Sequence, residues 1–463
     1  MQMQDLAKFR KFIHKSDSSP FRRTGRGILF SFTAHHPKGL YTVSIKPAAT
    51  NEQSRNVIDI NLHKRLIESN QQEYGRLYDL LTFGTPAQLQ AAMLERNQLL
   101  EWLSQNAEFG YCNTKVDCNG LSPGCQRCGD GVWSCLFING RCNGRCFYCP
   151  TPQDEDGPPV TNGLVFKNAG DYASYVAALN FSGVSISGGE PLMTPDLTIS
   201  YLSAVRKRCG DDIHLWLYTN GTLLTADLCQ RLHQAGLNEI RFDLGAVRYN
   251  LKKLRLAVGI IPTVTVEIPA VPQDEAQLRL KLVEMAESGV NHLNLHQMRL
   301  TKHNFGPLLE HNYTFLHGEK VTVLESELCA LRTVRFGIEH GIKLPVNYCS
   351  FAYKRRFQHA AARRRAALSV CKADETVTTA GYLRTLTENG VNYSEAAILQ
   401  NPSYRLPFEK ILLETGHPLY LERRPLTPVM ELSAIERETL ISGHHLQLTA
   451  RYENIESGLP EYF

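Results

Sequence analysis

The sequence lacks the signals of a membrane or exported protein. Residues 1–20 mix lysines, an arginine and aspartates without an apolar segment. Nowhere does the chain contain the ~18 consecutive apolar residues that a membrane-spanning helix needs. The formal net charge of +4 on 463 residues is small, so charge does not indicate a nucleic-acid partner. We therefore expect a cytoplasmic protein with no membrane association and no nucleic-acid ligand.

Cysteine is absent from residues 372–463 but crowded earlier in the chain. Eight of the 13 cysteines lie between Cys112 and Cys149. In a small secreted domain this density would indicate disulfides, but no export signal accompanies it. Ligation of a metal or cluster in a reducing compartment fits the pattern better.

Three of these thiols fall in a C-x3-C-x2-C pattern at Cys142, Cys146 and Cys149, in a glycine-bearing loop after an apolar, strand-like run. Three thiolates can hold three corners of a cubic [4Fe-4S] cluster and leave one iron open for a ligand that is not protein. A structural zinc knuckle, or cysteines with no shared role, is the alternative.

A second motif follows in the segment Gly183–Pro191, a short β-like run that ends in Gly188, Gly189, Glu190 and Pro191. Backbone without side chains can come close to a ligand's ammonium group and present carbonyls and a carboxylate to it. Two glycines alone would predict only a turn. Its position after the cysteine triplet is what makes this segment a candidate ligand-binding motif.

Together and in this order, the two motifs resemble those of the radical S-adenosylmethionine (SAM) superfamily. The resemblance implies that Cys142, Cys146 and Cys149 hold a [4Fe-4S] cluster whose open iron chelates the amino and carboxylate groups of SAM. It also implies a low-potential electron donor of the flavodoxin or ferredoxin type.

The resemblance assigns further SAM-binding roles. The backbone at Tyr148 would meet the adenine, while Gly188, Gly189 and Glu190 would bind the amino group of the methionine moiety. The cysteines and this glycine-rich segment are the most specific part of the likeness, which covers roughly residues 120–365.

Two later segments are similar to the pyruvate formate-lyase activating enzyme group. Thr219 and Asn220 match its third-strand Thr-Asn-Gly, but Tyr218 stands where Asp is usual. Asp243 matches its fourth-strand Asp-Leu, but Gly245 stands where Lys is common. These departures weaken the case for direct activation of a glycyl-radical enzyme. Asp243 is a candidate for the amino or ribose groups of SAM, or else a cap at a strand end.

Strand-like and helical segments alternate regularly from residue 136 to residue 295. Such β/α repeats predict a parallel sheet with right-handed crossovers, and the resemblance implies a partial TIM-like barrel with its ligands at the C-terminal strand ends. The predicted fold class is α/β: a partial (β/α)6 barrel with an N-terminal α+β domain and a C-terminal extension. Strands are expected at 136–139, 184–187, 214–218, 239–244, 263–268 and 292–295, and helices at 171–180, 195–208, 226–235, 247–258 and 277–288.

Four regions are expected along the chain. Residues 1–110 form the N-terminal domain, with strands near 27–32 and 40–45, either similar to a winged helix or a plain cap. Residues 111–135 form a cysteine-rich metal segment, residues 136–305 the barrel, and residues 306–463 the extension. The extension contains a basic helix at 350–370, interpreted as a solvated face that could also attract anionic substrate groups.

A second metal centre is expected around Cys125 and Cys128. A C-x2-C pair with glycine on both sides predicts a tight turn in which two thiolates address one metal. Cys349, just before the basic helix, is the expected distant ligand, and iron-sulfur is favoured over zinc. Further ligands remain open among Cys112, Cys118, Cys135 and Cys371, whereas Cys209, Cys229 and Cys329 suit packing as small hydrophobes.

The sequence therefore predicts a radical SAM enzyme. Its cluster would cleave SAM reductively to a 5′-deoxyadenosyl radical that abstracts hydrogen from a peptide or small-molecule substrate, with the help of a second, auxiliary iron-sulfur cluster. A SAM-binding iron-sulfur carrier or scaffold is the alternative from another class, and an activase of a partner enzyme is a further one. The Glu190 segment is evidence against a carrier, because a carrier does not need a binding site for the methionine moiety of SAM.

Overall fold

The computed structural model describes residues 30–36, 39–45, 63–64, 66–371, 375–378, 381–385, 420–423, 447–449 and 458–462. The chain divides into two compact units, residues 1–59 and 60–463. In the first unit, β1 (Phe30–His36) and β2 (Gly39–Ile45) form an antiparallel hairpin. No helix among the described residues is long and apolar enough to cross a membrane.

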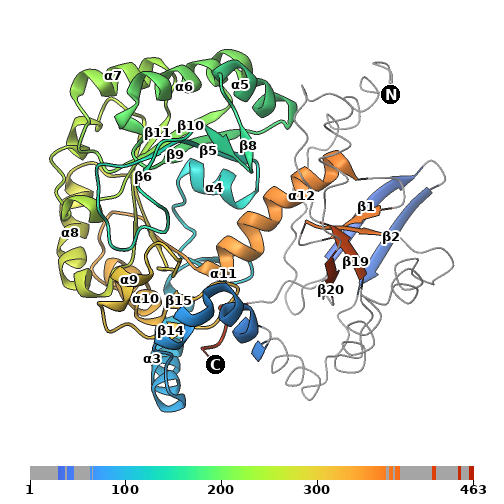
Figure 1. Cartoon of the computed structure of the whole chain (residues 1–463), viewed down its shortest axis with the longest axis vertical. Coiled ribbons are helices and arrows are strands. Elements are labelled where there is room, and N and C mark those ends of the chain that lie inside the picture. Colours follow the sequence, from blue (N-terminus) through green and yellow to red (C-terminus); the bar gives the residue numbers. More distant parts are fainter. Residues whose placement is uncertain are drawn as a thin grey trace. The chain divides into compact units, whose positions relative to one another are not determined.

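The second unit is built on a parallel sheet whose strands lie in chain order. All six predicted strands are present, as β5 (Trp133–Arg141), β9 (Gly183–Gly188), β10 (His214–Thr219), β11 (Glu239–Phe242), β12 (Thr263–Pro269) and β13 (His292–His296). The predicted α/β class with a partial parallel barrel is confirmed (Figure 1).

A seventh parallel strand, β16 (Val346–Cys349), was not predicted. It pairs with β13 and places Cys349 opposite His296. On its other side it pairs with the antiparallel β4, where Cys349 faces Lys115. Because β16 and β5 do not pair with each other among the described strands, the barrel is open. The short strands at its two edges are β3 (Phe109–Gly110), β4 (Lys115–Val116), β6 (Asp154–Glu155), β7 (Val160–Thr161) and β8 (Leu164–Val165).

Helices cover the outer face of the sheet (Figure 1). The predicted helix at 247–258 is wrong. A short 3-10 turn ends at Val247, because Arg248 and Tyr249 adopt positive φ angles of 53° and 57°, and a second one spans Leu254–Leu256. The helical elements are η1 (Gly75–Leu80), α3 (Pro86–Asn106), α4 (Pro123–Gly129), α5 (Ala169–Ala178), η2 (Pro191–Met193), α6 (Pro195–Cys209), α7 (Ala226–Gln234), η3 (Gly245–Val247), η4 (Leu254–Leu256), η5 (Pro272–Asp274), α8 (Glu275–Glu287), α9 (Phe305–Leu309) and α10 (Leu324–Glu339).

The chain then continues into the C-terminal region. The predicted basic helix is present but contains a π-helical stretch, as α11 (Phe351–Tyr353), η6 (Lys354–Gln358) and α12 (His359–Val370). Four short strands form a separate antiparallel sheet, and His444 and His445 lie outside the described residues. The remaining strands are β14 (Phe315–Leu316), β15 (Thr322–Val323), β17 (Glu375–Val377), β18 (Leu383–Thr385), β19 (Tyr420–Arg423) and β20 (Gln447–Thr449).

The two faces of the central strands differ in chemistry. Because side chains alternate along a strand, Leu215 and Leu217 point outward into the buried core under the helices, whereas Trp216 and Tyr218 point into the barrel. On β11 the inward positions are charged, Glu239 and Arg241, and both are buried. The interior of the barrel is therefore polar, and each buried charge there needs a partner.

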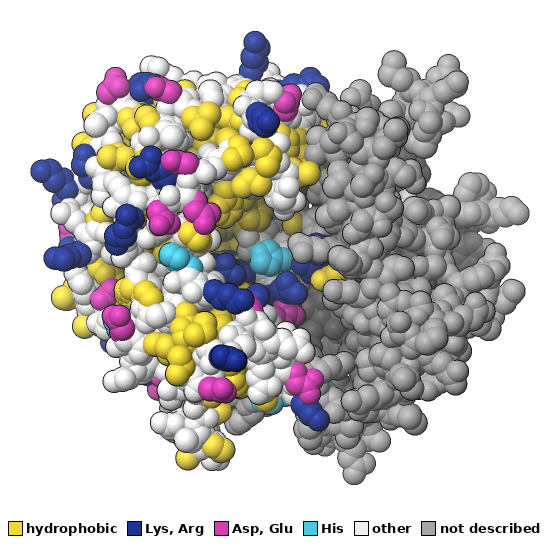
Figure 2. Space-filling view, in the orientation of Figure 1, with side chains coloured by type: hydrophobic (Ala, Val, Ile, Leu, Met, Phe, Trp, Pro, Cys, Tyr) yellow, Lys and Arg dark blue, Asp and Glu magenta, His cyan; other side chains and the backbone are white. Residues whose placement is uncertain are grey.

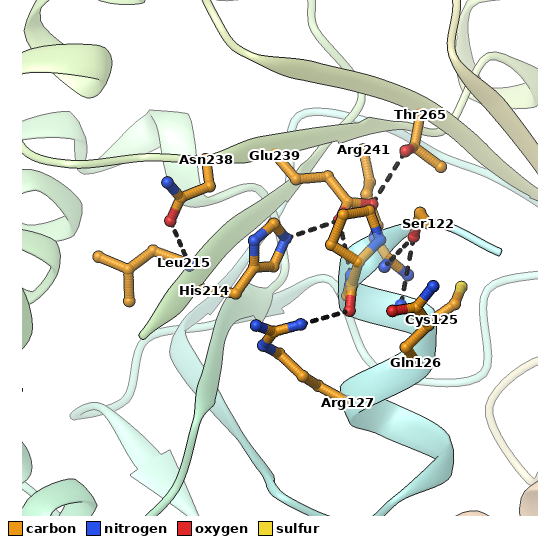
Figure 3. A network of polar contacts seen from close by, with 12 residues as sticks. Ser122, Cys125, Gln126, Arg127, His214, Leu215, Asn238, Glu239, Arg241 and Thr265 are labelled. Atoms are coloured by element: carbon orange, nitrogen blue, oxygen red, sulfur yellow. Dashed lines mark hydrogen bonds and ion pairs between the residues drawn. The ribbon is translucent and has the colours of Figure 1, made fainter. Parts of the chain in front are cut away.

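The helix α4 closes this interior near the N-terminal ends of the strands. The Glu239 carboxylate accepts hydrogen bonds from Arg241 Nε at 2.8 Å, from Thr265 Oγ1 at 2.9 Å and from the backbone N–H of Gly124 on α4 at 3.0 Å. It also lies 2.9 Å from His214 Nε2. Figure 3 shows this network between α4 and the strands. A Cβ on Gly124 would lie 2.3 Å from a guanidinium nitrogen of Arg241, so only glycine fits there.

We expect Glu239→Gln to lower the free energy of unfolding by about 3 kcal/mol at neutral pH, because it removes one of the two carboxylates that balance the buried Arg241 guanidinium. Burial alone would raise the pKa of Glu239, but the Arg241 cation and the His214 hydrogen bond lower it overall from its usual 4.5. A depressed carboxyl pKa stabilises the fold above 4.5 and loses that effect as pH falls toward the folded-state pKa. Urea unfolding should therefore show a weaker acid dependence in Glu239→Gln.

The exposed pair of Asp196 and Arg231 offers a control. Asp196→Asn should change stability by less than about 1 kcal/mol. Equal losses in the two variants would contradict a special role for the buried network.

Candidate functional site

The loop after β5 brings the predicted cluster thiols together. The backbone N–H of Gly144 donates to Cys142 Sγ at 3.2 Å. A Cβ built on Gly144 would lie 3.4 Å from Cys142 Sγ and 3.7 Å from Cys146 Sγ, so both sulfurs flank this glycine. The third thiol, Cys149, has its sulfur 3.4 Å from the carbonyl oxygen of Thr151 in the same loop. The donor set, three thiols on one short loop at a strand end, fits a three-cysteine iron-sulfur cluster.

The thiols of this loop are poor acids without a metal. Burial raises the pKa of Cys142, and the nearby negative charges of Glu190 and Cys149 add to that rise. Burial, followed by the charge of Asp243, raises the pKa of Cys146 to about 12. Because iron binds thiolates, assembly of a cluster here would release protons and relieve this penalty.

Glu190 is buried and joins the ends of two strands. Its carboxylate accepts hydrogen bonds from Leu192 N at 2.9 Å, Thr219 Oγ1 at 2.7 Å and Asn220 N at 2.7 Å. These bonds fix the tip of β9 to the tip of β10. The predicted contact of Glu190 with a ligand's ammonium group stays a prediction, and the carboxylate already has three partners in the fold.

The two glycines before Glu190 are required by strand packing. A Cβ on Gly188 would lie 2.2 Å from the carbonyl oxygen of Asn139, and one on Gly189 would lie 2.0 Å from that of Arg141, both on β5.

Asn139 was not predicted as a site residue. Its side-chain Nδ2 donates to Glu190 O and Thr194 Oγ1, whereas its Oδ1 is buried with no hydrogen-bond partner. Because buried acceptors normally have a hydrogen-bond donor, the free Asn139 Oδ1 beside the Gly188–Glu190 segment is suited to bind the ammonium group of a ligand.

The predicted Thr-Asn-Gly segment holds the cluster loop from the side of β10. Asn220 Nδ2 donates to Asn143 Oδ1 at 2.8 Å and lies 3.8 Å from Cys142 Sγ. Thr219 is occupied by its bond to Glu190. In this structure both predicted residues position other groups, and their contact with SAM stays a prediction.

Tyr148 and Asp243 form a buried pair on the other side of the loop. The Tyr148 hydroxyl lies 2.9 and 3.1 Å from the two carboxylate oxygens of Asp243. Burial raises the pKa of Asp243 to about 6, although the bond from Tyr148 acts in the opposite direction. Asp243 also accepts from Ala246 N at 3.3 Å, within η3, whose N-cap residue is Leu244.

This pair explains the departure from Lys at position 245. A Cβ on Gly245 would lie 2.5 Å from the Tyr148 hydroxyl, so any side chain there would displace the tyrosine. The backbone carbonyl of Tyr148, predicted to meet the adenine, accepts from Asn304 Nδ2 at 3.1 Å. Asn304 was missed because it lies far from the motifs in sequence.

The C-x2-C pair lies on a short helix, which corrects the predicted tight turn. Ser122 caps α4 by accepting from Cys125 N at 3.2 Å, and Pro123 occupies the first turn. A serine followed by a proline is a known start signal for a helix and could have revealed it. Cys125 and Cys128 are three residues apart on this helix and so share one of its faces.

Cys349 lies near this pair, and its role as a metal ligand stays a prediction. Asn294 Nδ2 donates to Cys125 Sγ at 2.9 Å, and Asn294 is bonded to Asn347, two residues before Cys349. Burial raises the pKa of Cys128 far above its usual value, and the charges of Cys125 and Cys349 raise it further. The three sulfurs are therefore electrostatic neighbours inside the protein.

Lys115 lies against Cys349 and was not predicted. Its ammonium is fully buried, 2.5 Å from Cys349 Sγ and 2.7 Å from Asn347 Oδ1, and packs over the ring of Tyr353. No carboxylate forms an ion pair with it among the described residues. Burial alone would lower the pKa of Lys115, but the neighbouring thiols of Cys349 and Cys125, when ionised, raise it overall. This cation therefore needs negative charge on those sulfurs.

The other cysteines differ in their surroundings. No disulfide joins any of the 13 cysteines. Of the possible additional ligands, Cys118 lies near Lys115, whereas Cys112 and Cys371 are exposed. Cys229 and Cys329 are buried like small hydrophobes, and Cys209 is half-buried. In the part of the chain that the structure describes, no three His, Cys, Asp or Glu side chains converge as they would around a single metal ion. A zinc ion would require ligands within about 2.3 Å of one point.

Known proteins resemble this chain in its central region. Residues 136–265 match the family model of the radical SAM superfamily. Over 275 residues the chain is 28% identical to a Methanocaldococcus jannaschii protein named as a glycyl-radical enzyme activating enzyme, covering 57% of this chain and 72% of that protein. Over 171 residues it is 27% identical to the GTP 3′,8-cyclase of Desulforamulus reducens, covering 36% of this chain but only half of the cyclase.

Solved structures resemble the chain weakly. SuiB of Streptococcus suis matches with a TM-score of 0.35 and 15% identity, over 48% of this chain and 51% of that one. Methylornithine synthase matches with a TM-score of 0.33 and 12% identity, over 62% of this chain and 85% of that one. These scores are too low to carry an argument about function.

We expect Gly189→Ala to destabilise the protein by about 1–3 kcal/mol, the usual cost of overpacking. The added methyl group would press on the Arg141 carbonyl and move the tip of β9 away from β5. Urea unfolding measures the loss, and iron content after reconstitution reports whether the adjacent cysteine loop still assembles a cluster. Gly157→Ala is the matched control, since nothing lies within 4 Å of its added Cβ. If both variants unfold like the unmodified protein, the close packing of β5 against Gly189 is refuted.

Proposed function

Because the chain carries a radical SAM domain and is an enzyme of that class, we propose that Cys142, Cys146 and Cys149 hold a [4Fe-4S] cluster that binds SAM through its open iron. When bound and reduced, this pair supplies a 5′-deoxyadenosyl radical that abstracts hydrogen from a substrate. The observation that carries the proposal is the position of Cys142 and Cys146 on either side of Gly144, with Cys149 in the same loop and electrostatically coupled to both. This loop follows β5 and lies beside the Gly188–Glu190 segment.

The protein's own residues would position SAM. The unpartnered Asn139 Oδ1 and the backbone of Gly188 and Gly189 are the groups suited to the methionine ammonium. Glu190 and Asn220 keep that backbone and the cysteine loop in fixed relation through hydrogen bonds. A preorganised site of this kind lowers the entropic cost of orienting the reacting groups.

A second iron-sulfur cluster at Cys125, Cys128 and Cys349 is part of the proposal. A buried ammonium without a counter-charge costs several kcal/mol, and among the described residues no carboxylate pairs with Lys115, whose ammonium lies against Cys349 Sγ. A thiolate-bound cluster would supply the missing negative charge. Cys118 is the nearest candidate for a fourth ligand, since its charge also acts on Lys115.

The substrate is a peptide or small molecule, and the electron comes from a low-potential flavodoxin- or ferredoxin-type donor. Activation of a partner enzyme is a second candidate, favoured by the likeness to the M. jannaschii protein. Incubation with a glycyl-radical enzyme would discriminate the two, because only an activase would produce a stable protein radical visible by electron paramagnetic resonance.

Replacing Cys142, Cys146 and Cys149 together by Ala should abolish formation of 5′-deoxyadenosine from SAM in the presence of dithionite, because the cluster would have no ligands. Product can be measured by liquid chromatography with mass detection. Cys209→Ala is the control, and it should cleave SAM normally. Undiminished cleavage by the triple variant would refute the assignment.

The same triple variant tests the second centre. It should retain about four irons per chain if an auxiliary [4Fe-4S] cluster is present. Further replacement of Cys125, Cys128 and Cys349 by Ala should remove this iron. Retention of zinc in place of iron would indicate a structural zinc site, and the absence of any metal would contradict a second centre.

A further inference from the structure

The inward-facing side chains near the C-terminal strand ends of the barrel are not fully buried. Tyr218, Glu267 and His296 are inward-facing residues near the C-terminal ends of β10, β12 and β13, and all three keep accessible surface, 19% for the Glu267 side chain. Their outward neighbours Leu217 and Leu295 have none. An interior that leaves polar side chains accessible can admit a ligand.

Two cations border this interior without a partner. Arg299 follows the end of β13, and Lys354 is the first residue of the π-helical stretch η6. Both are half-buried, and neither side chain forms a hydrogen bond or ion pair within the described part of the chain. π-helical turns inside α-helices occur frequently at functional sites.

Lys354 is close to the accessible interior residues. Burial alone would raise the pKa of Glu267, but the cations of Arg241 and Lys354 lower it overall. Burial, followed by the charge of Lys354, lowers the pKa of His296 to about 3, so this histidine is neutral at physiological pH. Arg299 shares the neighbourhood, because after burial the charges of Arg355, Arg363, Lys354 and Arg299 all lower the pKa of His359.

The nearby anions already have partners. Glu73, whose charge acts on Arg299, pairs with Lys320. Glu267 accepts from Arg241 NH1 at 2.5 Å and from Asn294 Nδ2 at 3.2 Å. Other cations of the basic helix have partners as well: Arg355 pairs with Glu319, and Arg365 donates to backbone carbonyls, including that of Leu179 at 2.7 Å. The basic helix is therefore not the plain solvated face expected from the sequence, and Lys354 stands apart from these arginines.

We propose that Arg299 and Lys354 bind an anionic group, a phosphate or carboxylate, of the substrate at the mouth of the barrel interior. This inference rests on the proposed function, which it deepens by naming the class of substrate. Figure 2 shows Lys, Arg and His side chains gathered in the hollowed middle of the described surface. An anion here would compensate two partly desolvated cations, and the planar fork of an arginine suits the geometry of both oxyanions.

Binding of two probes, inorganic pyrophosphate and citrate, tests the proposal by isothermal titration calorimetry on the full chain. The unmodified protein should bind at least one of them, and the tighter probe identifies phosphate or carboxylate as the preferred group. Arg299→Gln and Lys354→Gln should each weaken binding about tenfold or more, since each removes a charge-assisted hydrogen bond. Lys207→Gln, on exposed α6, is the matched control and should bind as the unmodified protein does.

Three results would overturn the proposal: no binding of either probe at millimolar concentration, unchanged affinity in both glutamine variants, or an equal loss in Lys207→Gln. Formation of 5′-deoxyadenosine without substrate separates this test from that of the proposed function. It is measured on the unmodified protein and on Lys207→Gln, and both should cleave SAM. Unchanged probe affinity with persistent cleavage refutes the anion site alone, whereas absence of cleavage in the unmodified protein refutes the radical SAM assignment itself.

Discussion

The guanidinium of Arg241 places a full positive charge inside the barrel, and the interior is arranged to balance it. Glu239 and Glu267 supply the negative charge, while Ser122 and Tyr218 complete its hydrogen bonds. Since Ser122 also caps α4, the same cation fixes the helix that carries Cys125 and Cys128. The position of the predicted second metal centre thus depends on a buried ion network.

The buried and half-buried cations of this fold differ in whether they have a carboxylate partner. Arg241 has carboxylate partners, but Lys115, Arg299 and Lys354 have none among the described residues. Uncompensated cations in partly dry surroundings are costly. Each of the three lies where a negatively charged ligand is proposed, a thiolate-bound cluster for Lys115 and a substrate anion for the other two.

The sequence predicted the elements that depend on local pattern. Six strands were found because buried parallel strands read as short apolar runs between helical segments. The seventh strand, β16, was missed because its four residues include the polar Asn347. The side-chain amide of Asn347 forms hydrogen bonds with Lys115 and Asn294 instead of packing in the hydrophobic core. The helix expected at 247–258 failed for a different reason. Its apolar spacing is helical, but Arg248 and Tyr249 adopt left-handed conformations that no periodicity reveals.

The sequence predicted those residues of the candidate site that belong to recognisable motifs. Asn139, Asn304 and Lys115 belong to no motif, and their roles arise only when distant segments pack together, as when Asn304 meets the backbone of Tyr148. Some motif residues have a different role in the structure from the one that the sequence predicts. The two glycines were expected to admit a ligand, yet the atoms closest to them are carbonyls of β5.

The glycine at position 245 leaves room for the Tyr148 hydroxyl. A side chain at Gly245 would collide with the Tyr148 hydroxyl, and that hydroxyl holds Asp243 beside Cys146. Tyr148 and Gly245 are thus coupled by space: a lysine at 245 would require the aromatic ring to leave Asp243. The chain therefore differs from the activating-enzyme pattern at position 245, on the side of the cysteine loop where the carboxylate of Asp243 binds Tyr148.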